Sequence, residues 1–94
     1  MTYEEFTQLT EPPADLSAYL IALWHERHDD WNRAHEIVQD IETVEASAIH
    51  AYLHRREGDK SNAQYWYNHA SRCASFDISM DEEWEKLVRE CLSL

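Results

Sequence analysis

The sequence has very few of the residues that build tight turns or disulfide frameworks. It contains one Gly, two Pro and two Cys among 94 residues. An all-β fold needs frequent turn residues, so their scarcity argues against strands and favours helices. Cys73 and Cys91 stand at apolar positions of helical patterns without CxxC spacing. We expect both to be small buried residues rather than a disulfide framework or metal ligands.

Basic residues are also scarce. Eight Lys and Arg face nineteen Asp and Glu, which gives a formal net charge of −11. Residues 1–17 have four acids and no base, and residues 77–94 have six acids and two bases. An electrostatic field of this sign repels phosphate backbones and anionic lipid headgroups. We therefore expect no nucleic-acid partner and no membrane-surface partner.

Long hydrophobic runs are missing as well. No apolar stretch approaches the ~18 residues of a membrane span, and the start of the chain lacks the apolar core of a signal peptide. A cytoplasmic location is the expectation that follows. The length indicates one small domain over residues 1–94, and a domain of this size has a limited core. We expect its four Trp, five Tyr and two Phe to contribute much of the buried area.

Apolar residues recur at helical spacing along most of the chain, which predicts an all-α fold. We expect an N-terminal arm at 1–13, a first antiparallel helix pair at 14–42, a second pair at 43–75 and a capping helix at 79–93. The first helix should begin at Ala14 behind Pro13. The other boundaries come from cap and stop residues, namely Asp29-Asp30, Gly58, Asp59 and the Ser79-x-x-Glu82 capping box.

The chain echoes itself at an offset of 29 residues, since Leu20–Ile41 reappears loosely as Ile49–Ala70. In the second copy Gly58-Asp59, Ala63, Tyr67 and Ala70 resemble the spacing of tetratricopeptide repeats. The resemblance covers residues 18–73. The first copy departs from the family pattern at Asp29 and Val38, where Gly and an aromatic are preferred. The segment around residues 50–67 also resembles small bacterial proteins without an assigned activity.

The tetratricopeptide resemblance implies a concave surface that binds a peptide. We expect a protein or peptide partner, acidic or C-terminal, whose carboxylates are bound by Arg side chains and whose contact area is supplied by Tyr rings. The alternative is that these Arg residues only pair with neighbouring acids. Apolar surface left by so short a stack would favour a homodimer. The implied surface consists of Tyr19, Leu23, Glu26, Arg27, Tyr52, Arg55 and Arg56.

The six His residues suggest a metal site as a second hypothesis. His50 and His54 lie one helical turn apart on one face, and the repeat aligns His25 with His54. Imidazoles at this spacing are typical zinc ligands. The alternative is that they form interhelical hydrogen bonds. Candidates for a further ligand are His28, His35, Glu57 and His69.

A third group of residues is polar and aromatic. Asn62, Tyr65 and Trp66, together with His50 and His54, suggest a pocket for a small ligand, with core packing and capping as the alternative. Cys73 and His69 form the one nucleophile-base pair at helical spacing, and it has no orienting third group. We therefore expect no enzymatic activity and no cofactor. The leading hypothesis is a protein-interaction or scaffolding module, and the alternative is a metal- or small-ligand-binding domain.

Overall fold

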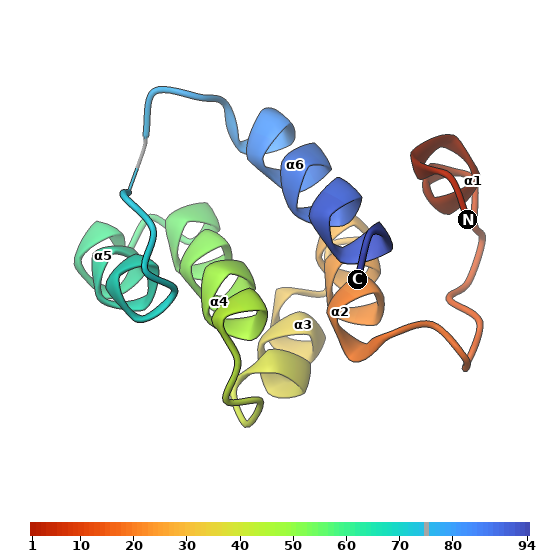
Figure 1. The fold of residues 1–94 in the computed structure, drawn as a ribbon, viewed down its shortest axis with the longest axis horizontal. Coiled ribbons are helices and arrows are strands. Elements are labelled where there is room, and N and C mark those ends of the chain that lie inside the picture. Colours follow the sequence, from red (N-terminus) through yellow and green to blue (C-terminus); the bar gives the residue numbers. More distant parts are fainter. Residues whose placement is uncertain (75) are drawn as a thin grey trace.

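A computed structural model of the chain, which describes residues 1–74 and 76–94, confirms the all-α class. The described residues contain no strand. None of their helices combines the length and the apolarity needed to cross a membrane. The end of the second predicted helix pair, at residue 75, lies outside the described residues. The helices, shown in Figure 1, are α1 (Tyr3–Thr7), α2 (Ala18–Arg27), α3 (Trp31–Val38), α4 (Val44–Arg56), α5 (Lys60–His69) and α6 (Met80–Leu92).

Side-chain caps set where the helices begin. Asp30, Asp59 and Ser79 accept hydrogen bonds from the backbone N–H three residues further on, which confirms the predicted starts of α3, α5 and α6. The predicted start of the first long helix at Ala14 is wrong. Helix α2 begins at Ala18 because Ser17 caps it through the Leu20 N–H. Helix α4 begins at Val44, where Thr43 caps it through the Ala46 N–H, within one residue of the start at 43 expected for the second pair.

Two turns join consecutive helices with the same geometry. Asp29 and Gly58, 29 residues apart, both have a left-handed backbone, with φ of 63° and 85°. After each of them an Asp N–H donates back to a His carbonyl at 2.9 Å, from Asp30 to His25 and from Asp59 to His54. These are Schellman-type ends, and they reverse the chain within three residues.

A third left-handed residue ends α5 sooner than expected. Ser71 has φ of 56°, and the Arg72 N–H donates to the Tyr67 carbonyl. Cys73 therefore lies beyond the helix and is exposed, so the prediction that it is buried is wrong. Cys91 is buried on α6 as predicted, and burial raises the pKa of its thiol to about 11.

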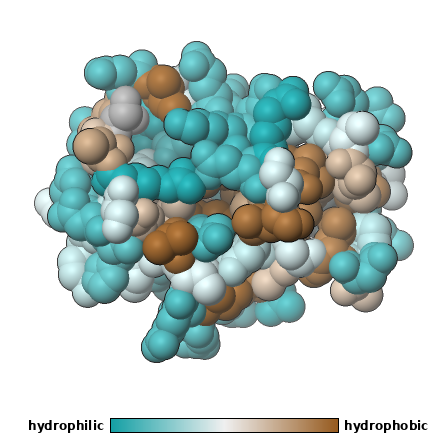
Figure 2. All heavy atoms as spheres, viewed as in Figure 1, coloured by the Kyte–Doolittle hydropathy of each residue, from teal (hydrophilic) through white to brown (hydrophobic). Residues whose placement is uncertain are grey.

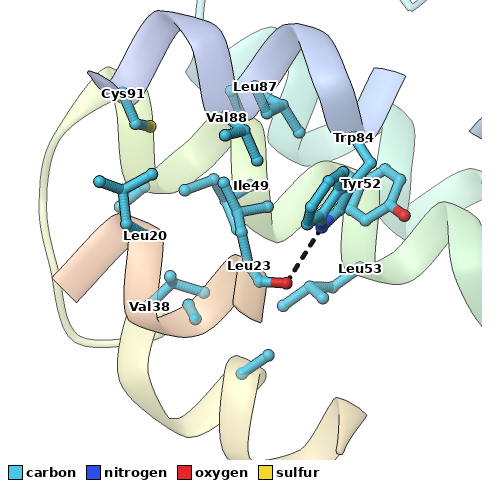
Figure 3. Packing of buried hydrophobic residues seen from close by; sticks show 14 of the residues in the cluster. Leu20, Leu23, Val38, Ile49, Tyr52, Leu53, Trp84, Leu87, Val88 and Cys91 are labelled. Carbon is cyan, nitrogen blue, oxygen red and sulfur yellow. Dashed lines mark hydrogen bonds between the residues drawn. The ribbon is translucent and has the colours of Figure 1, made fainter. Parts of the chain in front are cut away.

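Helix α4 is the centre of the domain. It contacts α2, α3, α5 and α6, and every residue from Ala46 to His54 is buried. A helix that is buried on all sides needs small residues where its neighbours approach closely, and α4 supplies Ala46, Ala48 and Ala51 at these contacts. Its larger side chains fill the main core together with those of α2 and α6 (Figure 3), including Ile49, Tyr52, Leu53, Leu23, Leu87 and Val88.

Helix α6 lies across α2 and α4, and α1 packs against α6 (Figure 1). Trp84 is the main contact. It is 3% exposed, and its indole N–H donates to the Leu23 carbonyl at 3.0 Å (Figure 3). The face shown in Figure 2 is mostly hydrophilic, with separate hydrophobic patches.

The two copies of the sequence echo differ in their surroundings. Leu53 is fully buried in the main core. Trp24, its counterpart at the offset of 29 residues, is half-buried and donates its indole N–H to the Leu9 carbonyl of the N-terminal segment. The two joints have one geometry, but these two side chains serve different contacts. The tetratricopeptide resemblance stays a prediction.

Candidate metal centre

Three imidazoles meet between α3 and α4. His35 comes from α3, and His50 and His54 lie one turn apart on α4. One ligand nitrogen from each ring lies within 4.8 Å of those of the other two. The Nε2 atoms of His35 and His50 are 3.0 Å apart. We call these three residues the His cluster.

Two tryptophans hold the rings of the His cluster in place. Trp31 stacks on His35 with ring centroids 4.9 Å apart and an angle of 9° between the planes, and its indole N–H donates to the Leu53 carbonyl. Trp66 stacks on His50 at 4.0 Å and 14°. These contacts restrict ring rotation. The ring nitrogens are therefore pre-oriented in the absence of any ligand.

The imidazoles of His35 and His50 are held in their neutral form. Burial, with His35 and His54 nearby, lowers the pKa of His50 to about 4, and burial also lowers the pKa of His35. A neutral imidazole has one nitrogen with a free lone pair, which is the form that binds metal ions. At 3.0 Å one Nε2 donates a hydrogen to the other. For both Nε2 atoms to bind a metal ion, the donor ring would move that proton to its own Nδ1.

Glu57 orients the third ring. Its Oε1 accepts a hydrogen bond of 2.6 Å from Nδ1 of His54. In the neutral ring Nδ1 therefore carries the proton, and Nε2 keeps the lone pair. A carboxylate on the non-ligating nitrogen of a histidine is the usual support of a zinc ligand, because it fixes the tautomer and makes the imidazole more basic.

A second group of His54, Glu57 and Asp59 also satisfies metal-ligand distances, but two of its members are exposed acids. The Asp59 carboxylate already caps α5 through the Asn62 N–H. A metal ion there would compete with the helix cap and with the His54–Glu57 hydrogen bond. The His cluster is the better site, since three nitrogen ligands converge there and a metal ion would disturb neither the helix cap nor the His54–Glu57 hydrogen bond.

The structure brings together His50, His54 and His35, one of the candidates for a further ligand. It does not bring His25 to them. The His25 ring packs edge-on against Trp24, with centroids 5.3 Å apart, and His25 does not belong to the metal-ligand groups found among the described residues. His28 stacks on Trp24, and His69 packs beside Tyr65 and Trp66.

The residues predicted to form a small-ligand pocket are only partly together. Trp66 lies on His50, as described above. Tyr65 is 54% exposed and packs edge-on against Trp66. Asn62 stands in the first turn of α5, where its backbone N–H is capped by Asp59. The members of this group that come together are therefore His50 and His54 of the His cluster and Trp66, which stacks on His50.

The residues predicted to bind a partner largely contact one another or α6. Tyr52 is 1% exposed, and its hydroxyl donates to Glu26. The side chain of Arg55 is 11% exposed and pairs with Glu83 of α6 at 2.7 Å. Helix α6 covers the face on which these residues were expected to meet a peptide. Tyr19, Arg27 and Arg56 remain partly exposed, and partner binding stays a prediction.

Glu26 is buried against two of those residues. Its Oε1 accepts a hydrogen bond from the Tyr52 hydroxyl at 3.2 Å and forms an ion pair with the Arg56 Nε, 3.0 Å away. Its Oε2 is buried and has no hydrogen-bond partner among the residues that the structure describes. Burial raises the pKa of Glu26, although Arg56 and the Tyr52 hydrogen bond oppose the shift. The charged carboxylate is therefore a source of strain, because half of it is desolvated and unpaired.

Glu26→Gln should make the domain less sensitive to rising pH. A carboxyl whose pKa is raised on folding favours the folded state at low pH, and that contribution is lost as pH rises through the folded pKa. The amide cannot ionise. Urea unfolding between pH 4.5 and 7.5 should show the variant gaining stability relative to wild type as pH increases. Glu42→Gln, at an exposed position, is the control, and an equal change in both variants would contradict the prediction.

Sequence reasoning grouped Trp66 with His50 and His54, but it missed Trp31, which stacks on His35, and Glu83, which pairs with Arg55. A signal for Trp31 was present, since Trp31 and His35 lie four residues apart on one helix and therefore share a face. The sequence gives no comparable signal for Glu83, because Glu83 is one of three consecutive acids in the first turn of α6. No protein-family model matches the chain, and no curated protein or solved structure is significantly similar to it.

Proposed function

We propose that this protein binds a divalent transition-metal ion of the Zn²⁺ class through His35, His50 and His54. The observation that supports it most directly is the convergence of three ring nitrogens within 4.8 Å of one another. Two ligands of a tetrahedral zinc ion with Zn–N bonds of 2.0–2.1 Å lie about 3.3 Å apart. The 3.0 Å separation of the His35 and His50 Nε2 atoms is already close to that value.

The chemistry of the site suits such an ion better than Ca²⁺ or Mg²⁺. Those ions require oxygen ligands, whereas imidazole nitrogen selects Zn²⁺, Cu²⁺, Ni²⁺ and Co²⁺. Glu57 would support His54 from outside the coordination sphere. Three protein ligands leave a fourth position for water or another donor. The ion would also tie α3 to α4, and so join the two halves of the helical assembly.

Binding should stabilise the folded state strongly. An ion that binds only the folded chain adds about 2.7 kcal/mol at a concentration of 100 times Kd. For a domain of this size that raises Tm by roughly 10–20 °C. We expect Zn²⁺ to produce this shift in the chelator-treated, untagged protein, and Co²⁺ to develop the visible absorption bands of a tetrahedral site.

Variants separate the His cluster from the other histidines. His35→Gln, His50→Gln and His54→Gln should each weaken Zn²⁺ binding by at least about 100-fold, and Glu57→Ala by about 10- to 100-fold, as for the loss of a supporting carboxylate. His25→Gln and His69→Gln are the matched controls, since neither belongs to the cluster. Competition titration with a chromophoric chelator measures the affinities. Wild-type affinity in the three cluster variants, or no binding at micromolar Zn²⁺, would refute the proposal.

A further inference from the structure

A cavity of about 400 Å³ lies between α1, the end of α2 and the start of α6, and none of its lining residues belongs to the His cluster. Its walls include four aromatic rings. Tyr3 and Phe6 come from α1, Trp24 from α2 and Trp84 from α6. The other lining residues are polar or charged, and a cavity of this size that combines aromatic rings with polar groups is typical of a small-molecule site.

The charged residues of this cavity belong mainly to one sign. Asp81, Glu82 and Glu85 line it from the first turns of α6, and Arg27 is the one Arg or Lys among the lining residues described. Glu85 is already paired with Arg89, and Asp81 with Arg27. Glu82 has no ion pair in the part of the chain that the structure describes. The field of the cavity therefore favours a cation over an anion.

Arg27 shows what kind of cation fits. Its guanidinium carbon lies 4.1 Å from the centroid of the Trp84 ring, and its Nη1 lies 3.2 Å from Oδ1 of Asp81. A planar cation over an aromatic face with a carboxylate at its edge is the arrangement that recognises guanidinium and amidinium groups. The contact is solvent-exposed, since the two side chains are 40% and 80% exposed. An incoming cation could therefore displace Arg27 at little cost.

We propose that this cavity binds a small organic cation with a planar charged group and an apolar body, and that Arg27 is an internal competitor for the same position. The charged group of the ligand takes the place of the Arg27 guanidinium between Trp84 and Asp81. The apolar body packs against Phe6 and Trp24. This site is separate from the His cluster and does not depend on metal binding.

Benzamidinium, benzamide and benzoate test the proposal, because they share one shape and differ in charge. Binding is followed by NMR of the four tryptophan indole N–H signals in the presence of a chelator. Benzamidinium should shift the signals of Trp24 and Trp84 and leave those of Trp31 and Trp66, beside the His cluster, unchanged. Benzamide and benzoate should bind at least about 3-fold more weakly, since neither offers a cation to the aromatic face.

Arg27→Gln gives the sharpest result. If Arg27 competes with the ligand, its removal should tighten benzamidinium binding by about 3- to 10-fold, as expected for the loss of a partly exposed cation–π contact. Lys86→Gln is the control. Lys86 is an exposed residue of α6 that does not line the cavity. Its replacement removes one positive charge, as Arg27→Gln does, and should change the benzamidinium affinity by less than about twofold. Weaker binding in Arg27→Gln, preference for benzoate, or no shift at millimolar benzamidinium would each overturn the proposal.

Discussion

Glu83→Ala is expected to lower the free energy of unfolding by about 3–5 kcal/mol, the usual cost of removing one partner from a buried ion pair. Glu83 is 7% exposed. Its Oε1 accepts from Arg55 at 2.7 Å, and its Oε2 accepts from the Tyr67 hydroxyl. Removing the carboxylate would leave the buried guanidinium of Arg55 without its counter-charge. A domain of about this length is stable by only about 5–15 kcal/mol, so the change would bring it close to unfolding.

The effect should be large because Glu83 connects three helices and a connecting segment. Arg55 belongs to α4, Tyr67 to α5 and Glu83 to α6. The second guanidinium nitrogen of Arg55 donates to the Ile78 carbonyl at 2.6 Å, just before α6 begins. Burial and the hydrogen bond to Glu83 raise the pKa of Tyr67, which keeps its hydroxyl a donor at neutral pH. Every polar side chain of the network therefore has a partner. The loss of one member leaves the groups that it bonded without a hydrogen-bond partner.

Urea unfolding followed by circular dichroism measures this cost, since urea does not screen charges as guanidinium chloride does. Glu82→Ala is the matched control. Glu82 is exposed in the same turn, so both variants lose one negative charge near the start of α6 and the effect on the helix dipole cancels. Glu83→Gln should give an intermediate loss, because its amide oxygen still accepts from Tyr67. A difference of less than about 1 kcal/mol between Glu83→Ala and Glu82→Ala would contradict the role of the network.

Local chemistry explains why most helix boundaries were predictable. A cap residue acts on an N–H only three positions away, so Asp30, Asp59 and Ser79 specify helix starts without knowledge of the tertiary structure. Gly58 is similar, because a left-handed residue ends a helix wherever it occurs. Ser71 was missed for the same physical reason, since a non-Gly residue carries no signal that it will adopt positive φ.

Contacts between helices were harder to predict. The pattern of α6 shows that it has an apolar face with Trp84, Leu87 and Val88, but the face does not specify which surface it will cover. It covers the side of α2 and α4 on which a partner surface was expected. Arg55 therefore pairs within the domain rather than with a peptide carboxylate.

The His cluster illustrates the same limit. The spacing of His50 and His54 on one helix could be read from the sequence, because i and i+4 share a face. The third member depends on how α3 lies against α4. Repeat alignment favoured His25, which belongs to the helix before α3. The choice between His25 and His35 is a property of helix packing, and no local pattern contains it.

The second large effect is expected for Trp84→Ala. This change should lower the free energy of unfolding by about 3–5 kcal/mol, the typical cost of truncating a fully buried Trp. The ring is 3% exposed and packs against Phe6 and Tyr3 with centroid distances of 5.9 and 6.1 Å. Its N–H also bonds the Leu23 carbonyl. Among the described helices α1 contacts α6 alone. We therefore expect the variant to lose both global stability and the attachment of α1.

Two readouts separate these consequences. Urea unfolding reports the global loss, whereas limited proteolysis of the segment between α1 and α2 reports release of the arm. The contacts left to the arm would include the Trp24 bond to the Leu9 carbonyl and the Arg89 guanidinium, which lies 4.5 Å from the Tyr3 ring centroid. Trp84→Phe should lower the free energy of unfolding by less than Trp84→Ala, because it keeps an aromatic ring against Phe6. It still loses the indole hydrogen bond. Tyr65→Ala is the control for removing an exposed aromatic, with an effect within about 0.5 kcal/mol. If Trp84→Ala and Tyr65→Ala had similar stabilities, α6 could not owe its position to Trp84. Its core residues Leu87 and Val88, together with the pair of Arg55 and Glu83, would then hold α6 across α2 and α4.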